Sequence, residues 1–168
     1  MQMPEPLPIQ DSKGTVLVTG ASGGVGSIAV RLLSHLGYRV AAVTGRPEQA
    51  GFLTELGAAE IVQREELEAP PRPLGPVRWA GAVDCVGGNV LRGAIASMAY
   101  RSNVAITGMA AGGEFTSGIY PLILRGVRLI GVESVYVPNE ERIRAWNLLS
   151  EIADELPAEA IHEIGLED

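Results

Sequence analysis

A glycine-rich turn near the start of the chain restricts the fold more than any other part of the sequence. It reads GASGGVG over residues 20–26 and directly follows a short apolar, β-branched run, residues 15–19. Such a run is typical of a strand buried on both faces of a parallel sheet. Residues 25–36 then place apolar side chains at helical spacing, and Gly37 stands where a helix C-terminal cap is expected. The sequence therefore predicts a buried strand, a tight turn and a helix in direct succession.

The turn has the small residues that a phosphate-binding backbone needs. Ala21, Gly23 and Gly26 occupy the small-residue positions of the strand–turn–helix fingerprint of dinucleotide-binding domains, with Gly20 just before them. Small residues let the backbone come close to a pyrophosphate, whose charge the helix N-terminal amides and the helix dipole stabilise. We therefore expect a dinucleotide site here, and a strand-to-helix turn without a ligand is the alternative.

Strands and helices alternate along the rest of the chain. Further strands are predicted over residues 39–44, 60–63, 80–85, 103–107 and 127–133, and further helices over residues 47–56, 89–99, 119–125 and 140–155. This alternation implies right-handed crossovers and an α/β fold, a doubly wound, parallel, six-stranded sheet of Rossmann type with strand order 3-2-1-4-5-6. Residues 65–78 contain Pro70, Pro71, Pro73 and Pro76, so we expect a surface loop there in place of a helix.

Length and composition agree with a single domain. The chain has 168 residues with 46% hydrophobic content, which is enough apolar material for one buried core. Residues 1–14 are Pro-rich and aperiodic, so we predict a flexible leader followed by one domain over residues 15–168. The net charge of -7 argues against a nucleic-acid surface, and no apolar run is long enough to span a bilayer. The single cysteine, Cys85, excludes an internal disulfide and a Cys-cluster zinc site, and it fits a reducing, cytoplasmic location.

The residues that follow the second predicted strand indicate which dinucleotide binds. NAD-specific domains place an acidic residue there for the adenosine ribose, whereas this chain has Thr44, Gly45 and Arg46. Because a hydroxyl and a guanidinium suit a 2′-phosphate, we predict NADPH. Arg64 ends the third predicted strand, a neighbour of the second, so two arginines could converge on one edge of the pocket. For both arginines, a solvated surface position is the alternative.

Other residues at strand ends give weaker signals. Asp84 ends the fourth predicted strand, where a carboxylate can act in catalysis or, as we favour, cap the following loop by accepting hydrogen bonds from backbone amides. Cys85 is expected to be a small buried apolar residue, since no histidine lies near it in the sequence. The glycine-rich loop 107–113 and Ser134 are expected to border the nicotinamide half of the crevice. We assign no catalytic residue and no metal ligand.

Residues 19–26 also match the T-G-x-x-x-G-x-G pattern of short-chain dehydrogenases. Catalysis in that family needs a Tyr-x-x-x-Lys pair. No tyrosine of this chain is followed four residues later by a lysine, and the only lysine, Lys13, lies near the N-terminus. An active short-chain dehydrogenase is therefore excluded.

Several segments instead resemble the medium-chain dehydrogenase/reductase superfamily, in its zinc-free, quinone-reductase-like branch and, within it, the acrylyl-CoA reductase group. The similar segments are GGVG at residues 23–26, TGR at 44–46, LGA at 56–58, WAGAVDCVG at 79–87, ILRGVRLIGVES at 123–134 and RAW at 144–146. The first segment is common to the superfamily, whereas those at 79–87 and 123–134 are more specific to the group.

The resemblance implies an oxidoreductase that uses NADPH to reduce the double bond of acrylyl-CoA, a 2-enoyl-CoA. It implies cofactor contacts from Ser22, Gly23, Gly24, Val25, Thr44, Gly45, Arg46, Arg64, Met109, Ile123 and Ser134. It also implies a homodimer formed through the sixth strands, and a catalytic domain that this chain lacks. We therefore expect the chain alone to be nearly inactive. A quinone oxidoreductase and a non-catalytic, NADPH-responsive binding module are the alternative functions.

Overall fold

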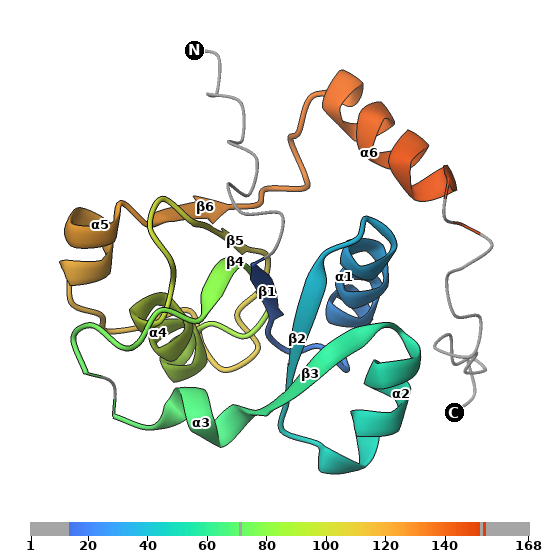
Figure 1. Cartoon of the computed structure of the whole chain (residues 1–168). Helices are drawn as coiled ribbons and strands as arrows, with labels where there is room; N and C mark the ends of the chain where they lie inside the picture. The colour runs from blue at the N-terminus through green and yellow to red at the C-terminus, as the bar shows by residue number, and fades with distance from the viewer. Residues whose placement is uncertain (1–13, 71, 152, 154–168) are drawn as a thin grey trace, which may run out of the picture.

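The computed structural model describes residues 14–70, 72–151 and 153, and Figure 1 shows how their helices and strands are arranged. The strands are β1 (Thr15–Val18), β2 (Arg39–Thr44), β3 (Ala58–Gln63), β4 (Trp79–Asp84), β5 (Asn103–Ile106) and β6 (Arg128–Gly131). The helices are α1 (Gly24–His35), the 3-10 helix η1 (Pro47–Gln49), α2 (Ala50–Glu55), α3 (Arg64–Glu68), α4 (Gly88–Ala96), α5 (Tyr120–Arg125) and α6 (Asn139–Glu151).

The strands form one parallel sheet with the order β3-β2-β1-β4-β5-β6, which confirms the predicted doubly wound fold. Alternate side chains of β2 enter two different cores. Ala41 and Val43 belong to the core that α3 and α4 cover, whereas Val40 and Ala42 belong to the core that α1 and α2 cover. Figure 1 shows these two pairs of helices on opposite sides of the sheet. Burial of both faces explains why β2 is a continuous apolar run and not an alternating one.

The turn between β1 and α1 depends on a close approach of two glycines. Gly20 has a φ of +60°, in the left-handed region that favours glycine. A Cβ atom at Gly26 would lie 2.2 Å from the carbonyl oxygen of Gly20, so α1 can pack against the end of β1 only with glycine there. At its other end α1 is closed by Gly37, whose φ of +82° matches the predicted C-terminal cap.

The structure corrects one prediction, because residues 64–68 form helix α3 where a loop over residues 65–78 was predicted. The prolines that argued against a helix all follow its last residue. Gln63 and Glu66 form a capping box, in which each side chain accepts a hydrogen bond from the other residue's backbone N–H. Arg64 consequently begins α3 and does not end the third strand.

Helix α3 is short and is held mainly by its contact with α4. Leu67 is buried in the core. A Cβ atom at Gly93 of α4 would lie 2.0 Å from the carbonyl oxygen of Leu67, so the glycine provides the space in which α3 packs. The packing fixes α3 against α4 on this face of the sheet.

The other elements agree with prediction apart from their ends. β3 begins at Ala58, two residues earlier than predicted, and β6 is shorter at both ends. α6 buries none of its residues and stands apart from the sheet in Figure 1. Residues 1–13 of the predicted leader and residues 152, 154 and 155 of the predicted last helix lie outside the described residues. None of the described helices is long and apolar enough to cross a membrane.

Candidate functional site

A hollow with a volume of about 660 Å³ opens at the carboxyl ends of β1, β2 and β4. It is lined by the glycine-rich turn, by the end of β2 as far as Arg46, by Arg64 at the start of α3, and by residues that follow β4 and β5. The strand order reverses at this point, because β1 has β2 on one side and β4 on the other. Open α/β sheets bind their ligands at such positions.

The N-terminus of α1 lies in the wall of this hollow and is open to an anion. α1 has no side-chain N-cap hydrogen bond and no acidic residue in its first turn. The N–H of Gly23 donates to the carbonyl oxygen of Gly20 at 2.9 Å and so closes the turn. A Cβ atom at Gly24 would meet no other atom within 4 Å. Open space, helix amides and the positive end of the helix dipole therefore coincide.

Ser22, Thr44 and Arg46 form a hydrogen-bonded cluster on the rim of the same hollow. Nη2 of Arg46 donates to Oγ of Ser22 at 3.0 Å and to the Ser22 carbonyl oxygen at 3.3 Å. Oγ1 of Thr44 lies 3.2 Å from Oγ of Ser22 and accepts the backbone N–H of Arg46 at 3.0 Å. No carboxylate of the described residues forms an ion pair with Arg46. Its guanidinium is therefore held in place without being neutralised.

Arg64 brings a second guanidinium to this hollow. It lies over the backbone of Gly45, because a Cβ atom there would be 3.1 Å from Nε and 3.2 Å from Cζ of Arg64. Nε of Arg64 also pairs with Oε1 of Glu68 at 3.4 Å. Both side chains of this pair are more than a third exposed, so the pair holds Arg64 only weakly.

A second hollow, of about 510 Å³, adjoins the first and shares Thr107 and Gly108 with it. It is lined by the start of α4, by the glycine-rich loop after β5, and by residues that end or follow β6. Met109 belongs to this lining and is 70% exposed. The two hollows thus lie side by side along the carboxyl edge of the sheet.

Asp84 ends β4 and is fully buried. Its Oδ1 accepts a hydrogen bond from the Thr19 hydroxyl at 2.6 Å, and its Oδ2 accepts the backbone N–H of Gly87 at 2.9 Å. Oγ1 of Thr19 in turn accepts the N–H of Cys85 at 3.1 Å. These bonds confirm the capping role that the sequence favoured over a catalytic one. They join the residue before the glycine-rich turn to the start of α4.

Cys85, expected to be a small buried apolar residue, is only half-buried and lies in the wall of the first hollow. Burial raises the pKa of its thiol above the ordinary value, and the nearby charge of Asp84 raises it further. The hydroxyl of Thr107, which donates to Sγ at 3.2 Å, acts in the opposite direction on this pKa. The net rise keeps the thiol protonated at neutral pH, which disfavours a role as a nucleophile.

The structure brings most of the predicted cofactor residues together. Eight of them line the first hollow, namely Ser22, Gly23, Gly24, Val25, Thr44, Gly45, Arg46 and Arg64. Met109 lines the second hollow, whereas Ile123 and Ser134 line neither. Ile123 is 67% exposed on α5, and the carbonyl oxygen of Ser134 accepts a hydrogen bond from Arg142 of α6 at 2.8 Å.

Sequence reasoning missed Thr19 as the partner of Asp84. A signal existed, because Thr19 is a polar residue at the end of a buried apolar run and stands directly before the turn. It is fully buried in the structure. A hydroxyl buried at such a position needs a partner, and Asp84 at the end of the neighbouring strand was an available one.

Comparison with known proteins places the chain in a family. The sequence profile of the zinc-binding dehydrogenases matches residues 24–151. The chain belongs to this family. Membership confirms the resemblance to the medium-chain dehydrogenase/reductase superfamily. Within the described part of the chain, no group of three or more His, Cys, Asp or Glu side chains could hold a metal ion.

Individual relatives are reductases or oxidoreductases. The acrylyl-CoA reductase AcuI of Ruegeria pomeroyi is 50% identical over 149 residues, which are 88% of this chain and 44% of the relative. The putative quinone oxidoreductase YhfP of Bacillus subtilis is 42% identical over 163 residues, 95% of this chain and 49% of the relative. The chain thus spans about half the length of the curated relatives that it matches.

Solved structures give the same result. The yhdH oxidoreductase of Salmonella enterica, crystallised in complex with NADP, superposes with a TM-score of 0.82 and 47% identity, over 90% of this chain and 46% of that one. The yhfP protein of Bacillus subtilis, crystallised with NAD bound, superposes with a TM-score of 0.81 and 44% identity, over 85% of this chain and 44% of that one.

Proposed function

We propose that this chain is the nucleotide-binding domain of an NADPH-dependent reductase. The observation that carries the proposal is that an open helix N-terminus and two arginines share one hollow. The helix N-terminus suits a pyrophosphate. Arg46, held by hydroxyl groups and without a carboxylate partner among the described residues, suits the 2′-phosphate that distinguishes NADPH from NADH. The NADP complex of the Salmonella oxidoreductase supports this choice.

Each predicted residue has a role in this proposal. Residues 22–25 bind the pyrophosphate, and residues 44–46 together with Arg64 bind the adenosine end with its 2′-phosphate. Met109 borders the second hollow, which has room for the nicotinamide half. Roles for Ile123 and Ser134 rest on the family resemblance alone, since neither lines a hollow described above.

For the whole protein we infer reduction of an activated carbon–carbon double bond, with acrylyl-CoA or another 2-enoyl-CoA as substrate. The similarity to the Ruegeria acrylyl-CoA reductase supports this substrate class. The bound cofactor supplies the hydride, and the residues of this chain hold and orient it along the carboxyl edge of the sheet. Contacts with the acyl-CoA come from a catalytic domain outside this chain, so the chain alone is expected to be nearly inactive.

A quinone oxidoreductase is the second candidate function. The likeness to the Bacillus protein named as a putative quinone oxidoreductase favours it, and that protein was crystallised with NAD. The two candidates differ in substrate, so assays of the whole protein with acrylyl-CoA and with a quinone decide between them.

We further propose that the protein forms a homodimer through β6, an edge strand of the sheet. An exposed strand edge has unpaired backbone donors and acceptors that a second copy can satisfy.

A cytoplasmic location fits the single free thiol, because cytosolic thiols are kept reduced.

Titration calorimetry of the 168-residue chain with NADPH and with NADH tests the cofactor proposal. We expect tighter binding of NADPH. Substitution Arg46→Ala should weaken NADPH by about 1 to 3 kcal/mol, the size of a lost charge-assisted hydrogen bond, and leave NADH nearly unchanged. Arg144→Ala, which removes the same charge from α6, is the control and should affect neither cofactor.

Two results would contradict the proposal. If Arg46→Ala loses equal affinity for NADPH and NADH, Arg46 does not contact the 2′-phosphate. Measurable reduction of acrylyl-CoA by the purified chain would show that the chain needs no further domain for catalysis.

A further inference from the structure

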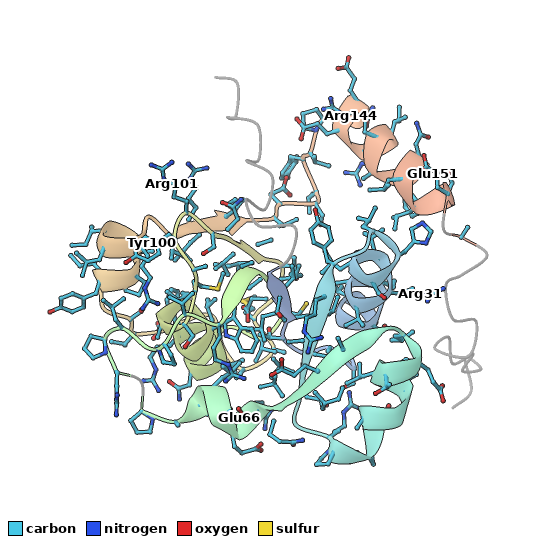
Figure 2. The ribbon with its side chains drawn as sticks, viewed as in Figure 1. Arg31, Glu66, Tyr100, Arg101, Arg144 and Glu151 are labelled. Carbon is cyan, nitrogen blue, oxygen red and sulfur yellow. The ribbon has the colours of Figure 1, made fainter. Side chains whose placement is uncertain are left out.

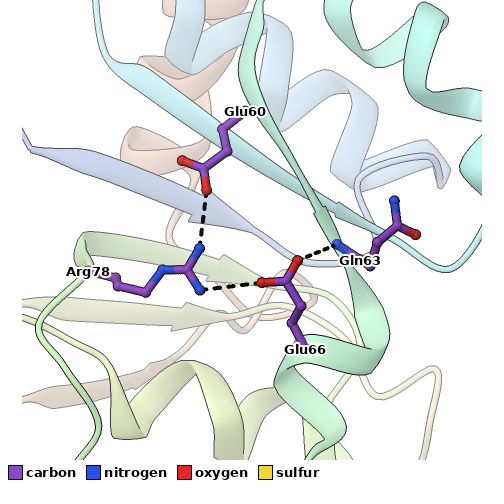
Figure 3. A network of polar contacts seen from close by, with 4 residues as sticks. All are labelled: Glu60, Gln63, Glu66 and Arg78. Carbon is purple, nitrogen blue, oxygen red and sulfur yellow. Dashed lines mark hydrogen bonds and ion pairs between the residues drawn. The ribbon is translucent and has the colours of Figure 1, made fainter.

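Arg78 contacts three elements at once, as Figure 3 shows for two of them. Its Nη2 lies 3.1 Å from Oε1 of Glu60 on β3, and its Nη1 lies 3.5 Å from Oε2 of Glu66 on α3. Its guanidinium carbon lies 4.3 Å from the centre of the ring of Trp79, the first residue of β4. Trp79 is only 1% exposed, so this cation–π contact fastens the arginine to the core.

Glu66 connects Arg78 to the first turn of α3. While Oε2 of Glu66 faces Arg78, its Oε1 accepts the backbone N–H of Gln63 at 3.3 Å. The Gln63 side chain accepts the N–H of Glu66 in return, and this capping box sets the residue at which α3 begins. Arg64 is that first helical residue. Its backbone therefore lies between Gln63 and Glu66, the two residues of the capping box.

We propose that Arg78 is a positioning residue for cofactor selection. It holds Glu60 and Glu66, fixes the start of α3, and thereby directs the Arg64 guanidinium over Gly45 toward the 2′-phosphate of NADPH. The inference rests on the proposed NADPH-binding function. Arg78 itself lines a different hollow, of about 190 Å³, between α3 and α4. Its effect on the cofactor therefore passes through α3.

The arrangement calls for arginine in particular. A guanidinium presents several donors in a rigid fork and can hold two carboxylates while it stacks on an aromatic ring, whereas the ammonium of lysine is a point charge. The ion pairs are weak individually, because the side chains of Arg78 and Glu66 are 36% and 49% exposed. We therefore expect that loss of the Arg78 charge raises the dissociation constant for NADPH only severalfold.

The test compares binding of NADPH and NADH to Arg78→Met, which keeps an unbranched apolar side chain next to Trp79 but loses the guanidinium and its charge. Calorimetry of the 168-residue chain should show a dissociation constant for NADPH that rises about threefold to tenfold, with that for NADH changed by less than about twofold. Arg78→Lys should restore only part of the preference. Arg144→Met removes the same charge from α6, far from α3 in Figure 2, and should change neither constant.

Two further variants separate positioning from a general structural role. In an Arg64→Ala background, Arg78→Met should cause no additional loss of NADPH affinity, because the residue that it positions is gone. Glu66→Gln keeps an oxygen that can accept the Gln63 N–H but loses the charge that faces Arg78. Like Arg78→Met, it should weaken the preference for NADPH over NADH. It also provides the test if Arg78→Met does not fold.

An equal loss of NADPH and NADH affinity in both Arg78→Met and Glu66→Gln would overturn the inference. Loss of NADPH affinity that persists undiminished without Arg64 would also overturn it. These outcomes differ from failure of the proposed function, in which the wild-type chain binds neither cofactor or binds both equally.

Discussion

Asp84 has a buried carboxylate on which two other buried groups depend. The Thr19 hydroxyl and the Gly87 N–H both donate to it. A buried donor left without an acceptor costs about 1 to 3 kcal/mol. We therefore predict that Asp84→Leu, which removes both acceptors, lowers the free energy of unfolding by about 2 to 5 kcal/mol, measured by urea denaturation.

Asp84→Asn is the matched comparison. Its single amide oxygen can accept from Gly87, but its NH2 group then faces Thr19, which must reverse its own hydrogen bond. The loss should be smaller than for leucine. If the two variants are equally stable, the hydrogen bonds of Asp84 do not hold this part of the fold together.

At the scale of elements, two glycines in the first turn of α1 have different roles: Gly26 is needed for packing, whereas Gly24 is placed to affect cofactor binding. A Cβ atom at Gly26 would overlap the Gly20 carbonyl, whereas one at Gly24, which lines the first hollow, would meet no atom within 4 Å. We predict that Gly26→Ala lowers the free energy of unfolding by about 1 to 3 kcal/mol, as overpacking does. Gly24→Ala should keep wild-type stability but weaken NADPH and NADH equally, because both carry the pyrophosphate.

Thermal unfolding and calorimetry of the two variants measure these effects. The reverse pattern, with Gly24→Ala unstable or Gly26→Ala unaffected, would show that the turn does not pack as described. A selective loss of one cofactor in Gly24→Ala would contradict its place at the pyrophosphate.

The elements differ in how far the sequence determines them. Strand β2 and helix α1 were predictable, since an apolar run and a glycine-bounded amphipathic segment are local patterns. α3 was missed because residues 65–78 were judged as one segment, and its prolines, which all follow Glu68, argued against any helix there. The Gln63–Glu66 spacing was the available signal. Contacts such as Thr19 with Asp84 join residues 65 positions apart, so only the strand order reveals them.

At the scale of the whole molecule, the sheet ends in an edge strand beside exposed apolar side chains. β6 is followed by Val132, Val135 and Tyr136, which are 51%, 72% and 90% exposed. If dimers form through this edge, sedimentation equilibrium should show self-association at micromolar concentrations. Val135→Asp should weaken the association, because it places a charge beside the paired strands.

Ile143→Asp on α6 is the control for that experiment. It likewise replaces an exposed apolar side chain, here 57% exposed, by an aspartate, but on α6 and not beside β6. It should leave the association constant unchanged. A chain that stays monomeric at every concentration tested would contradict the dimer.

The position of Arg64 over Gly45 has a consequence for protein engineering. The two arginines of the first hollow come from different elements, one after β2 and the other at the start of α3. On the proposed function, a loop graft that replaces only residues 44–46 with those of an NAD-dependent relative would leave Arg64 and its supporting network intact. Conversion of cofactor preference in this scaffold therefore requires redesign of two separate segments, and the second of them is tuned from Arg78, outside the binding pocket.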